Sequence, residues 1–172
     1  MALWLKDLYE DYITEELSED VVNNNPKPIV PGGIYFGSLR SLNDNKPNKP
    51  LYFLILRKID DNLYEVLKVS DWYLFATYSD LIIPLNGINA IVETNLNFYL
   101  TQEEISKFIL IDSVSEEELK EIKEFRDGLD PTLLKKGFTP IFTPIFEDDI
   151  RNKFKQEEFN QIKEFTQEFL KF

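Results

Sequence analysis

The sequence predicts an α+β fold: a small antiparallel β-barrel flanked by an N-terminal amphipathic helix and by C-terminal helices. Short apolar segments separated by polar turns fill residues 32–112, which is typical of a small barrel. Apolar residues recur at helical spacing near both ends of the chain, at 3–17 and 148–171. The 172 residues, of which 43% are hydrophobic, suffice for a single compact domain with appended helices.

The N-terminal segment is predicted to form a helix over residues 1–17, followed by an extended linker over 18–31. Acidic side chains alternate with an apolar set at helical spacing, namely Leu5, Leu8, Tyr9, Tyr12, Ile13 and Leu17. The run Asn23–Pro28 then interrupts regular structure, because asparagine favours turns and each proline fixes its own φ. The helix should therefore join the barrel through a stretch without helix or strand.

The predicted barrel, residues 32–112, begins with a strand at 34–36 that follows Pro31-Gly32-Gly33. A long polar loop from Arg40 to Lys49 separates this strand from the next one. Residues 51–56 form an unbroken apolar run, which suits a strand that is buried on both faces.

The turn Asp60-Asp61-Asn62 predicts a hairpin between that buried strand and a strand over 63–69. Short strands at close spacing with polar turns favour a barrel or a sandwich. We expect the shorter strands at 73–77, 81–85, 90–95 and 108–111.

Helices are predicted to dominate residues 113–172 and to pack on the barrel. Thr101 with Glu104, and Ser115 with Glu118, have the spacing of capping boxes before helices at 102–107 and 116–127. Asp130-Pro131 predicts one further short turn of helix. The last helix, 148–171, carries an apolar stripe formed by Ile150, Phe154, Phe159, Ile162, Phe165, Phe169 and Phe172.

An internal repeat, Phe138-Thr139-Pro140-Ile141-Phe142-Thr143-Pro144-Ile145-Phe146, lies between the last two predicted helices. Prolines four residues apart exclude an ordinary helix. One interpretation is an extended ribbon packed on the barrel. The other is a partner-docking segment, because extended proline-containing strands cost little entropy to order.

The chain contains neither histidine nor cysteine, and this excludes several kinds of chemistry. The side chain best suited to proton transfer near neutral pH is absent, as are the thiolate nucleophile and the soft metal ligands. We therefore expect no cofactor and no metal. Serine catalysis would need lysine as its base, and no Ser-x-x-Lys arrangement supports it.

The formal net charge is -12, and the acidic excess is spread along the chain. A nucleic-acid duplex or an anionic membrane would meet net repulsion, so neither is expected as a partner. No apolar run reaches the roughly 20 residues of a membrane span, and the acidic N-terminus lacks the basic head of a secretory signal. A cytoplasmic location is the expectation.

Residues 31–112 resemble the SH3-like barrel of the PemK/MazF-type toxin superfamily. The resemblance lies in the opening Pro31-Gly32-Gly33-Ile34-Tyr35-Phe36, the loop ending in Lys49-Pro50 and the apolar run 51–56. It implies an endoribonuclease or a gyrase-directed toxin in which Arg40 or Lys49 acts with Thr77. The chain departs from the family pattern in having Lys49 in place of arginine and Gly33 in place of an acidic residue.

Two groups of residues are candidates for binding. The cationic group could receive an anion or a phosphate, or could simply be a solvated loop and strand end; its members are Arg40, Lys46, Lys49, Arg57 and Lys58. The aromatic group could stack on a ligand or be buried in the core, and it comprises Trp72, Tyr73 and Tyr78. The acid pairs at 60–61 and 148–149 are better explained by turn and helix-start chemistry than by catalysis.

The leading functional hypothesis is a non-catalytic interaction or regulatory module with a protein partner. The Phe-rich face of 148–172 is broad enough to pack on the barrel or to form a homodimer with a second copy. One alternative is a metal-independent endoribonuclease of the toxin type, or a degenerate relative of one. Another is an acidic inhibitor that mimics nucleic acid.

Overall fold

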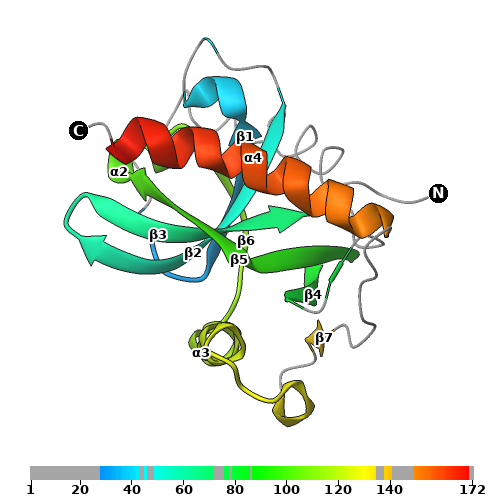
Figure 1. Cartoon of the computed structure of the whole chain (residues 1–172). Coiled ribbons are helices and arrows are strands. Elements are labelled where there is room, and N and C mark those ends of the chain that lie inside the picture. Colours follow the sequence, from blue (N-terminus) through cyan, green and yellow to red (C-terminus); the bar gives the residue numbers. More distant parts are fainter. Residues whose placement is uncertain are drawn as a thin grey trace.

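The computed structural model describes residues 28–42, 45, 49–71, 76–77, 79–85, 87–134, 138–140 and 149–170. The helix expected over residues 1–17 and most of the expected linker lie outside this part of the chain. The described residues form an α+β fold built on one antiparallel sheet that curls into a half-barrel (Figure 1).

The sheet has seven strands in the order β6-β1-β2-β3-β5-β4-β7, and each neighbouring pair is antiparallel. This arrangement confirms the predicted antiparallel β unit. The strands are β1 (Gly33–Ser38), β2 (Pro50–Asp60), β3 (Leu63–Ser70), β4 (Asp80–Leu85), β5 (Ile88–Thr101), β6 (Ile109–Ser113) and β7 (Thr139–Pro140).

The turn before β1 requires a glycine. Gly32 has a φ of 94°, its N–H donates to the Ile55 carbonyl at 2.7 Å, and its carbonyl accepts from the Val114 N–H at 2.9 Å. A side chain at this position would be strained by the positive φ and would also meet the Val114 carbonyl oxygen. The Pro31-Gly32 turn thereby joins β1 to the strands on both of its sides.

The predicted hairpin is confirmed, since β2 and β3 pair on either side of Asp61-Asn62. The Asp60 carboxylate accepts the Asn62 N–H at 2.9 Å, which is the turn chemistry expected for this motif. A bulge between Ile55 and Arg57 shifts the register in the middle of β2.

Strand β5 is much longer than the segment predicted at 90–95, because it continues to Thr101. Leu96, Phe98 and Leu100 alternate there with polar or half-buried side chains, a pattern that indicates a strand and was missed. Its first half pairs with β4, and it pairs with β3 on its other side. The strand predicted at 73–77 is wrong where it can be checked, since Ala76 and Thr77 lie in a loop.

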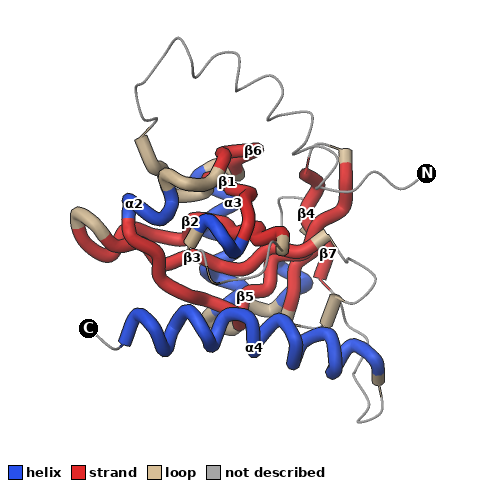
Figure 2. The backbone as a smooth tube through the Cα atoms, turned by 90° about the horizontal axis from the view of Figure 1, so that it is seen from above, coloured by secondary structure: helices blue, strands red, loops and turns tan. Residues whose placement is uncertain are grey.

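The sheet buries a hydrophobic cluster on each of its two faces. One cluster includes Leu54, Leu67 and Val92 and is covered by α3 (Glu116–Arg126) through Leu119, Ile122 and Phe125. The other includes Phe53, Val66 and Phe98 and receives Ile162 from α4 (Ile150–Leu170). Figure 2 shows α4 lying across the sheet, with α3 on the far side.

The helix boundaries follow the predicted caps. Capping boxes are present at Thr101 before α2 (Gln102–Ile105) and at Ser115 before α3. Pro131–Leu133 forms a short 3-10 turn, η3, and a second 3-10 turn, η1 (Leu39–Ser41), overlaps the start of the loop predicted from Arg40 to Lys49. Among the helices of the described segments, none combines the length and apolarity needed to cross a membrane.

The described start of the internal repeat is extended, as one interpretation predicted. Thr139 and Pro140 pair with Ile82 and Leu81 of β4, and Phe138 is buried in the cluster beneath α3. Residues 141–146 of the repeat lie outside the part of the chain that the structure describes. The ribbon interpretation is therefore confirmed for 138–140.

Among the described side chains, the apolar stripe predicted on the last helix packs on the sheet only in part. Ile150 and Phe159 are 66% and 48% exposed, whereas Glu158 and Ile162 are buried. The reason is that the sheet presents charged side chains to α4, so charged side chains of the helix face the sheet in turn. The side chains at 165, 169 and 172 lie outside the described set.

Candidate functional site

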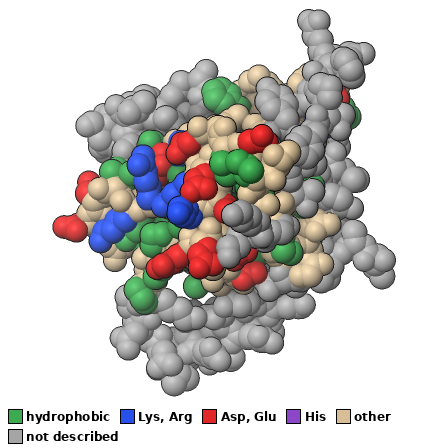
Figure 3. Space-filling model, turned by 90° about the horizontal axis from the view of Figure 1, so that it is seen from below, with side chains coloured by type: hydrophobic (Ala, Val, Ile, Leu, Met, Phe, Trp, Pro, Cys, Tyr) green, Lys and Arg blue, Asp and Glu red, His purple; other side chains and the backbone are tan. Residues whose placement is uncertain are grey.

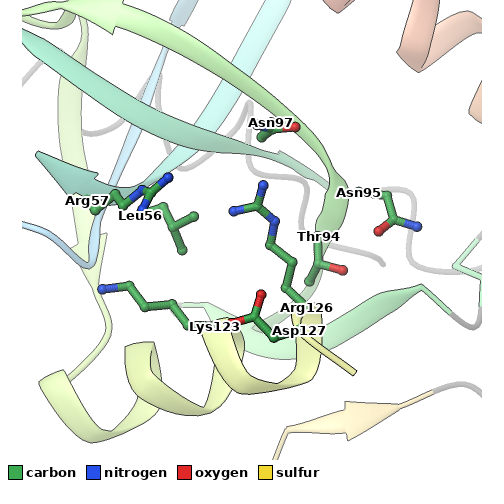
Figure 4. A pocket seen from close by; sticks show the side chains of 8 residues that line it. All are labelled: Leu56, Arg57, Thr94, Asn95, Asn97, Lys123, Arg126 and Asp127. Carbon is green, nitrogen blue, oxygen red and sulfur yellow. The ribbon is translucent and has the colours of Figure 1, made fainter. Parts of the chain in front are cut away.

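A polar cavity of about 420 Å³ opens between the sheet and the C-terminal half of α3 (Figure 4). This volume lies at the lower end of the range of small-molecule sites. Leu56 provides the apolar part of its lining, and polar or charged groups provide the rest. The lining residues are Leu56, Arg57, Thr94, Asn95, Asn97, Lys123, Arg126 and Asp127.

Local irregularities of two strands lie at this cavity. The bulge in β2 lies immediately before Arg57, and the register of β5 against β3 shifts between Asn97 and Glu93. Thr94 and Asn95 fall within that shift, and the Thr94 hydroxyl donates to the Ser79 carbonyl at 2.6 Å. The cavity therefore lies where the regular pairing of both strands is interrupted.

Helix α3 contributes Lys123 and Arg126, which are three residues apart and therefore project from one face of the helix. Figure 4 shows their cationic groups and that of Arg57 around the side chain of Leu56. Seen from below, the Lys and Arg side chains form a compact group between acidic side chains (Figure 3).

A buried carboxylate orients the two guanidinium groups. Glu65 is 1% exposed, and its Oε1 accepts from Arg57 Nε at 2.8 Å and from Arg126 Nη1 at 3.3 Å. Its Oε2 accepts from Asn97 Nδ2 at 3.1 Å and from the Tyr99 hydroxyl at 3.3 Å. Burial disfavours the ionised form, but Arg126, Asn97 and Arg57 outweigh that effect and hold the pKa of Glu65 below its ordinary value.

This arrangement suits an anion. Arg57, Lys123 and Arg126 supply three positive charges against Asp127 in the lining and Glu65 behind it. Each guanidinium has five N–H donors in a planar fork that matches a carboxylate or a phosphate, and the bond to Glu65 engages one donor of each. The amides of Asn95 and Asn97 add neutral hydrogen-bonding groups that could select among anions.

Two of the predicted cations lie at the two ends of the β1–β2 connection. Arg40 and Lys49 are both exposed, and the Leu39 N–H donates to the Lys49 carbonyl at 2.9 Å, which brings their backbones together. Lys58 is exposed, with its Nζ 3.9 Å from Asp61 Oδ1. Of the predicted binding residues, only Arg57 lines the cavity, and Lys46, Trp72, Tyr73 and Tyr78 lie outside the described residues.

Thr77 lies in a different region of the sheet from Arg40 and Lys49. It precedes β4, which is separated from β1 by β2, β3 and β5 in the strand order. Its side chain is buried, and its N–H and Oγ1 donate to Asp80 Oδ2 at 2.7 Å and 3.2 Å. The structure therefore brings Arg40 and Lys49 together but places Thr77 in a hydrogen-bonded turn of its own.

Four residues at the site were not predicted from the sequence, namely Glu65, Asn97, Lys123 and Arg126. A signal was present for Glu65, because it shares a face of β3 with Leu67 and Val69 and interrupts an apolar pattern. A glutamate at such a position must find a cation. No comparable signal pointed to Lys123 or Arg126, which look like ordinary solvent-facing residues of an amphipathic helix.

No group of three or more acidic, histidine or cysteine side chains among the described residues is arranged to hold a metal ion. The sequence matches no model of a known protein family and no curated protein. The fold and the site together define a class, an α+β half-barrel protein with a cationic cavity at the end of α3.

Proposed function

We propose that this protein is a non-catalytic binding module, and that the cavity at the end of α3 receives an anionic group of its ligand, a carboxylate or a phosphate. The observation that carries the proposal is the convergence of Arg57, Lys123 and Arg126 on one polar cavity. In a chain with a net charge of -12, such a local excess of positive charge is unusual.

The size of the ligand follows from the range of electrostatic forces. Exposed charges interact over about 8–10 Å at physiological ionic strength. Inside the cavity, three cations against the carboxylates of Asp127 and Glu65 leave a local excess of one positive charge, which attracts a single anionic group. A long polyanion would extend over the acidic surface and be repelled, so a small molecule or one acidic side chain fits better than a nucleic acid.

The cavity is better suited to binding than to catalysis. Its neighbouring buried carboxylate, Glu65, has a pKa held below its ordinary value and is a weak proton acceptor near neutral pH. Histidine and cysteine are absent from the whole sequence. The cations can hold and neutralise a ligand, but the described lining contains no group that shuttles protons at neutral pH.

The proposal is tested by calorimetric titration with inorganic phosphate, citrate and the neutral molecule glycerol. Lys123→Gln removes one cation without touching the bonds to Glu65, and should weaken anion binding about fivefold, the equivalent of about 1 kcal/mol. Lys58→Gln is the matched control, since Lys58 is an exposed cation beside Arg57 that does not line the cavity.

The expected pattern is binding of the anions but not of glycerol, weakened by Lys123→Gln and by added salt and unchanged by Lys58→Gln. Preference for phosphate over citrate, or the reverse, assigns the ligand class. An absence of anion binding, or equal losses in both variants, would contradict the proposal.

A second candidate is that the half-barrel is SH3-like and related to the PemK/MazF-type toxins, with metal-independent ribonuclease activity. The observation that favours it is the opening turn and β1, which lead to Arg40 and Lys49 at one end of the molecule. This candidate predicts cleavage of RNA by the purified protein without metal, lost in Arg40→Ala or Lys49→Ala. Intact RNA across a broad panel would remove it.

A further inference from the structure

Charged side chains join the described part of helix α4 to the sheet. Lys155 Nζ donates to Asp80 Oδ1 at 2.5 Å and to Glu93 Oε1 at 2.9 Å. One turn further along the helix, Glu158 Oε2 lies 2.7 Å from Lys68 Nζ. These five side chains form what we call the α4 cluster, with Lys68 from β3, Asp80 from β4, Glu93 from β5, and Lys155 and Glu158 from α4.

The α4 cluster is largely shielded from water. Asp80 and Glu93 are 0% exposed in their side chains, and those of Lys68, Glu158 and Lys155 are 5%, 11% and 21% exposed. Asp80 has additional hydrogen bonds from Thr77, but Glu93 Oε2 has no hydrogen-bond partner among the described residues.

The charges of the α4 cluster do not balance. When every group is ionised, three carboxylates face two ammonium groups, which leaves one negative charge in a dry interface. An uncompensated buried charge is strongly destabilising, and a neutral carboxyl is much less so. Binding of one proton would bring the cluster to neutrality, and Glu93 is the carboxylate with an oxygen that lacks a partner.

We propose that α4 is a proton-sensitive strap: the α4 cluster binds one proton when the helix docks, and docking tightens as the pH falls through the neutral range. Docking seals the face of the sheet where Ile162 packs against the cluster of Phe53, Val66 and Phe98. Loosening of α4 would open that apolar face together with the charged groups of the sheet.

The electrostatics of Glu93 support this proposal. Burial, reinforced by Glu158 and Asp80, raises the pKa of Glu93 to about 7 against the opposing effects of Lys68 and Lys155. Burial also raises the pKa of Asp80, although Lys155 and Thr77 oppose it. Burial lowers the pKa of Lys155, but Glu93 and Asp80 outweigh that effect and raise it, so Lys155 remains charged throughout.

The sign of the effect follows from linkage. When α4 lifts, Glu93 meets water and its pKa returns towards 4.5, so the docked state binds the proton more tightly than the undocked state. Protonation of Glu93 stabilises the docked state at low pH, and this stabilisation is lost as the pH rises through about 7. Between about pH 8 and about pH 6 the docking equilibrium should strengthen about tenfold.

The test uses a chain that has no cysteine of its own. Ile162→Cys places a thiol on α4 where it is 4% exposed and packed on the sheet, so a maleimide reaches it when α4 lifts. Phe159→Cys, on the same helix at a position that is 48% exposed, is the matched control for the ordinary pH dependence of thiol reactivity. The ratio of the two labelling rates reports docking.

We expect protection of Ile162→Cys relative to Phe159→Cys to be about tenfold greater at about pH 6 than at about pH 8. Glu93→Gln in both backgrounds should remove this dependence. Glu158→Gln leaves two carboxylates and two ammonium groups in the α4 cluster, so it should also reduce the pH dependence of protection. It provides a second variant if Glu93→Gln fails to fold. Equal protection at both pH values, or a dependence that survives both substitutions, would overturn the proposal.

Discussion

At the scale of the residue, Glu65 has two opposing effects on the cavity. It orients the guanidinium groups of Arg57 and Arg126, and it also neutralises part of their charge. Arg57 is 57% exposed, so water screens much of its attraction to Glu65, while Arg126 is more buried. Removal of the Glu65 charge should therefore change stability and ligand binding in opposite directions.

Glu65→Gln should lower the free energy of unfolding by about 1–2 kcal/mol, because two guanidinium groups lose their carboxylate partner. The same substitution should tighten binding of phosphate or citrate several-fold, since the cavity gains one unit of positive charge. Urea unfolding and calorimetric titration measure the two effects. A variant with weaker anion binding would show that Glu65 serves chiefly to position the arginines.

At Gly37 on β1 there is no room for a side chain. A Cβ at this position would overlap the ring of Phe108, which lies edge-on to Phe53 with centroids 4.9 Å apart. Gly37→Ala should therefore cost about 1–3 kcal/mol of unfolding free energy by overpacking. Phe108→Leu makes room for that Cβ. The double variant Gly37→Ala, Phe108→Leu should therefore lose less unfolding free energy than the sum of the losses in the two single variants. Additive losses in urea unfolding would refute this explanation.

At the scale of the element, helix α3 links the capping motif to the candidate site. Ser115 Oγ accepts the Glu118 N–H at 3.1 Å, and Glu118 Oε1 accepts the Ser115 N–H at 2.9 Å. The first turn of the helix is fixed by this box, and the last turn carries Lys123 and Arg126. A change far from the cavity can therefore alter the placement of its cations.

Ser115→Ala should cost about 1 kcal/mol of stability, because the N-terminal N–H groups of α3 lose their side-chain acceptor. Anion binding should weaken slightly as α3 frays. Ser113→Ala, an exposed serine at the end of β6, is the control and should change neither property. Urea unfolding and calorimetry provide the readouts, and equal stability losses in both variants would argue against the cap.

The elements were predictable where local chemistry decides them. The capping boxes and the β2–β3 hairpin each depend on residues close in sequence, and the structure has both. The length of β5 was not predictable in the same way. Its second half mixes asparagine and tyrosine with apolar residues, and only pairing with β3 decides that it continues as a strand.

At the scale of the whole molecule, the two faces of the sheet respond oppositely to pH. Glu65 has a lowered pKa, so its contribution to stability is present above its unfolded pKa and is lost as the pH falls through its folded value. Glu93 has a raised pKa, so its contribution is complete below its unfolded pKa of 4.5 and is lost as the pH rises through about 7.

From these two groups the unfolding free energy should be greatest near pH 4.5 and should decline on both sides. The decline between about pH 5.5 and about pH 8 should be about 2 kcal/mol and should shrink in Glu93→Gln. Urea unfolding followed by circular dichroism across this range measures it. A stability maximum above pH 7 would show that Glu93 does not titrate as its burial requires.

The candidate site was the least predictable part of the molecule. It gathers Arg57 from β2, Asn97 from β5 and Lys123 from α3, and the sequence alone does not show that these elements meet. Arg57 was identified because several basic residues lie near it in the sequence. Lys123 and Arg126 look ordinary in the sequence and become part of the site only because the sheet curls. Pairing between strands distant in sequence therefore brings the site residues together, whereas local motifs determine the helix starts and turns of the elements that carry them.

The outermost strand of the sheet, β7, consists of Thr139 and Pro140, and its neighbour β4 contains Pro84. A proline nitrogen has no hydrogen to offer an incoming chain, so this flank is a poor template for further strands. Fibril growth by strand pairing between copies is thereby obstructed at this edge of the sheet. Concentrated solutions of the protein should for this reason remain free of amyloid-like aggregates that start from this flank.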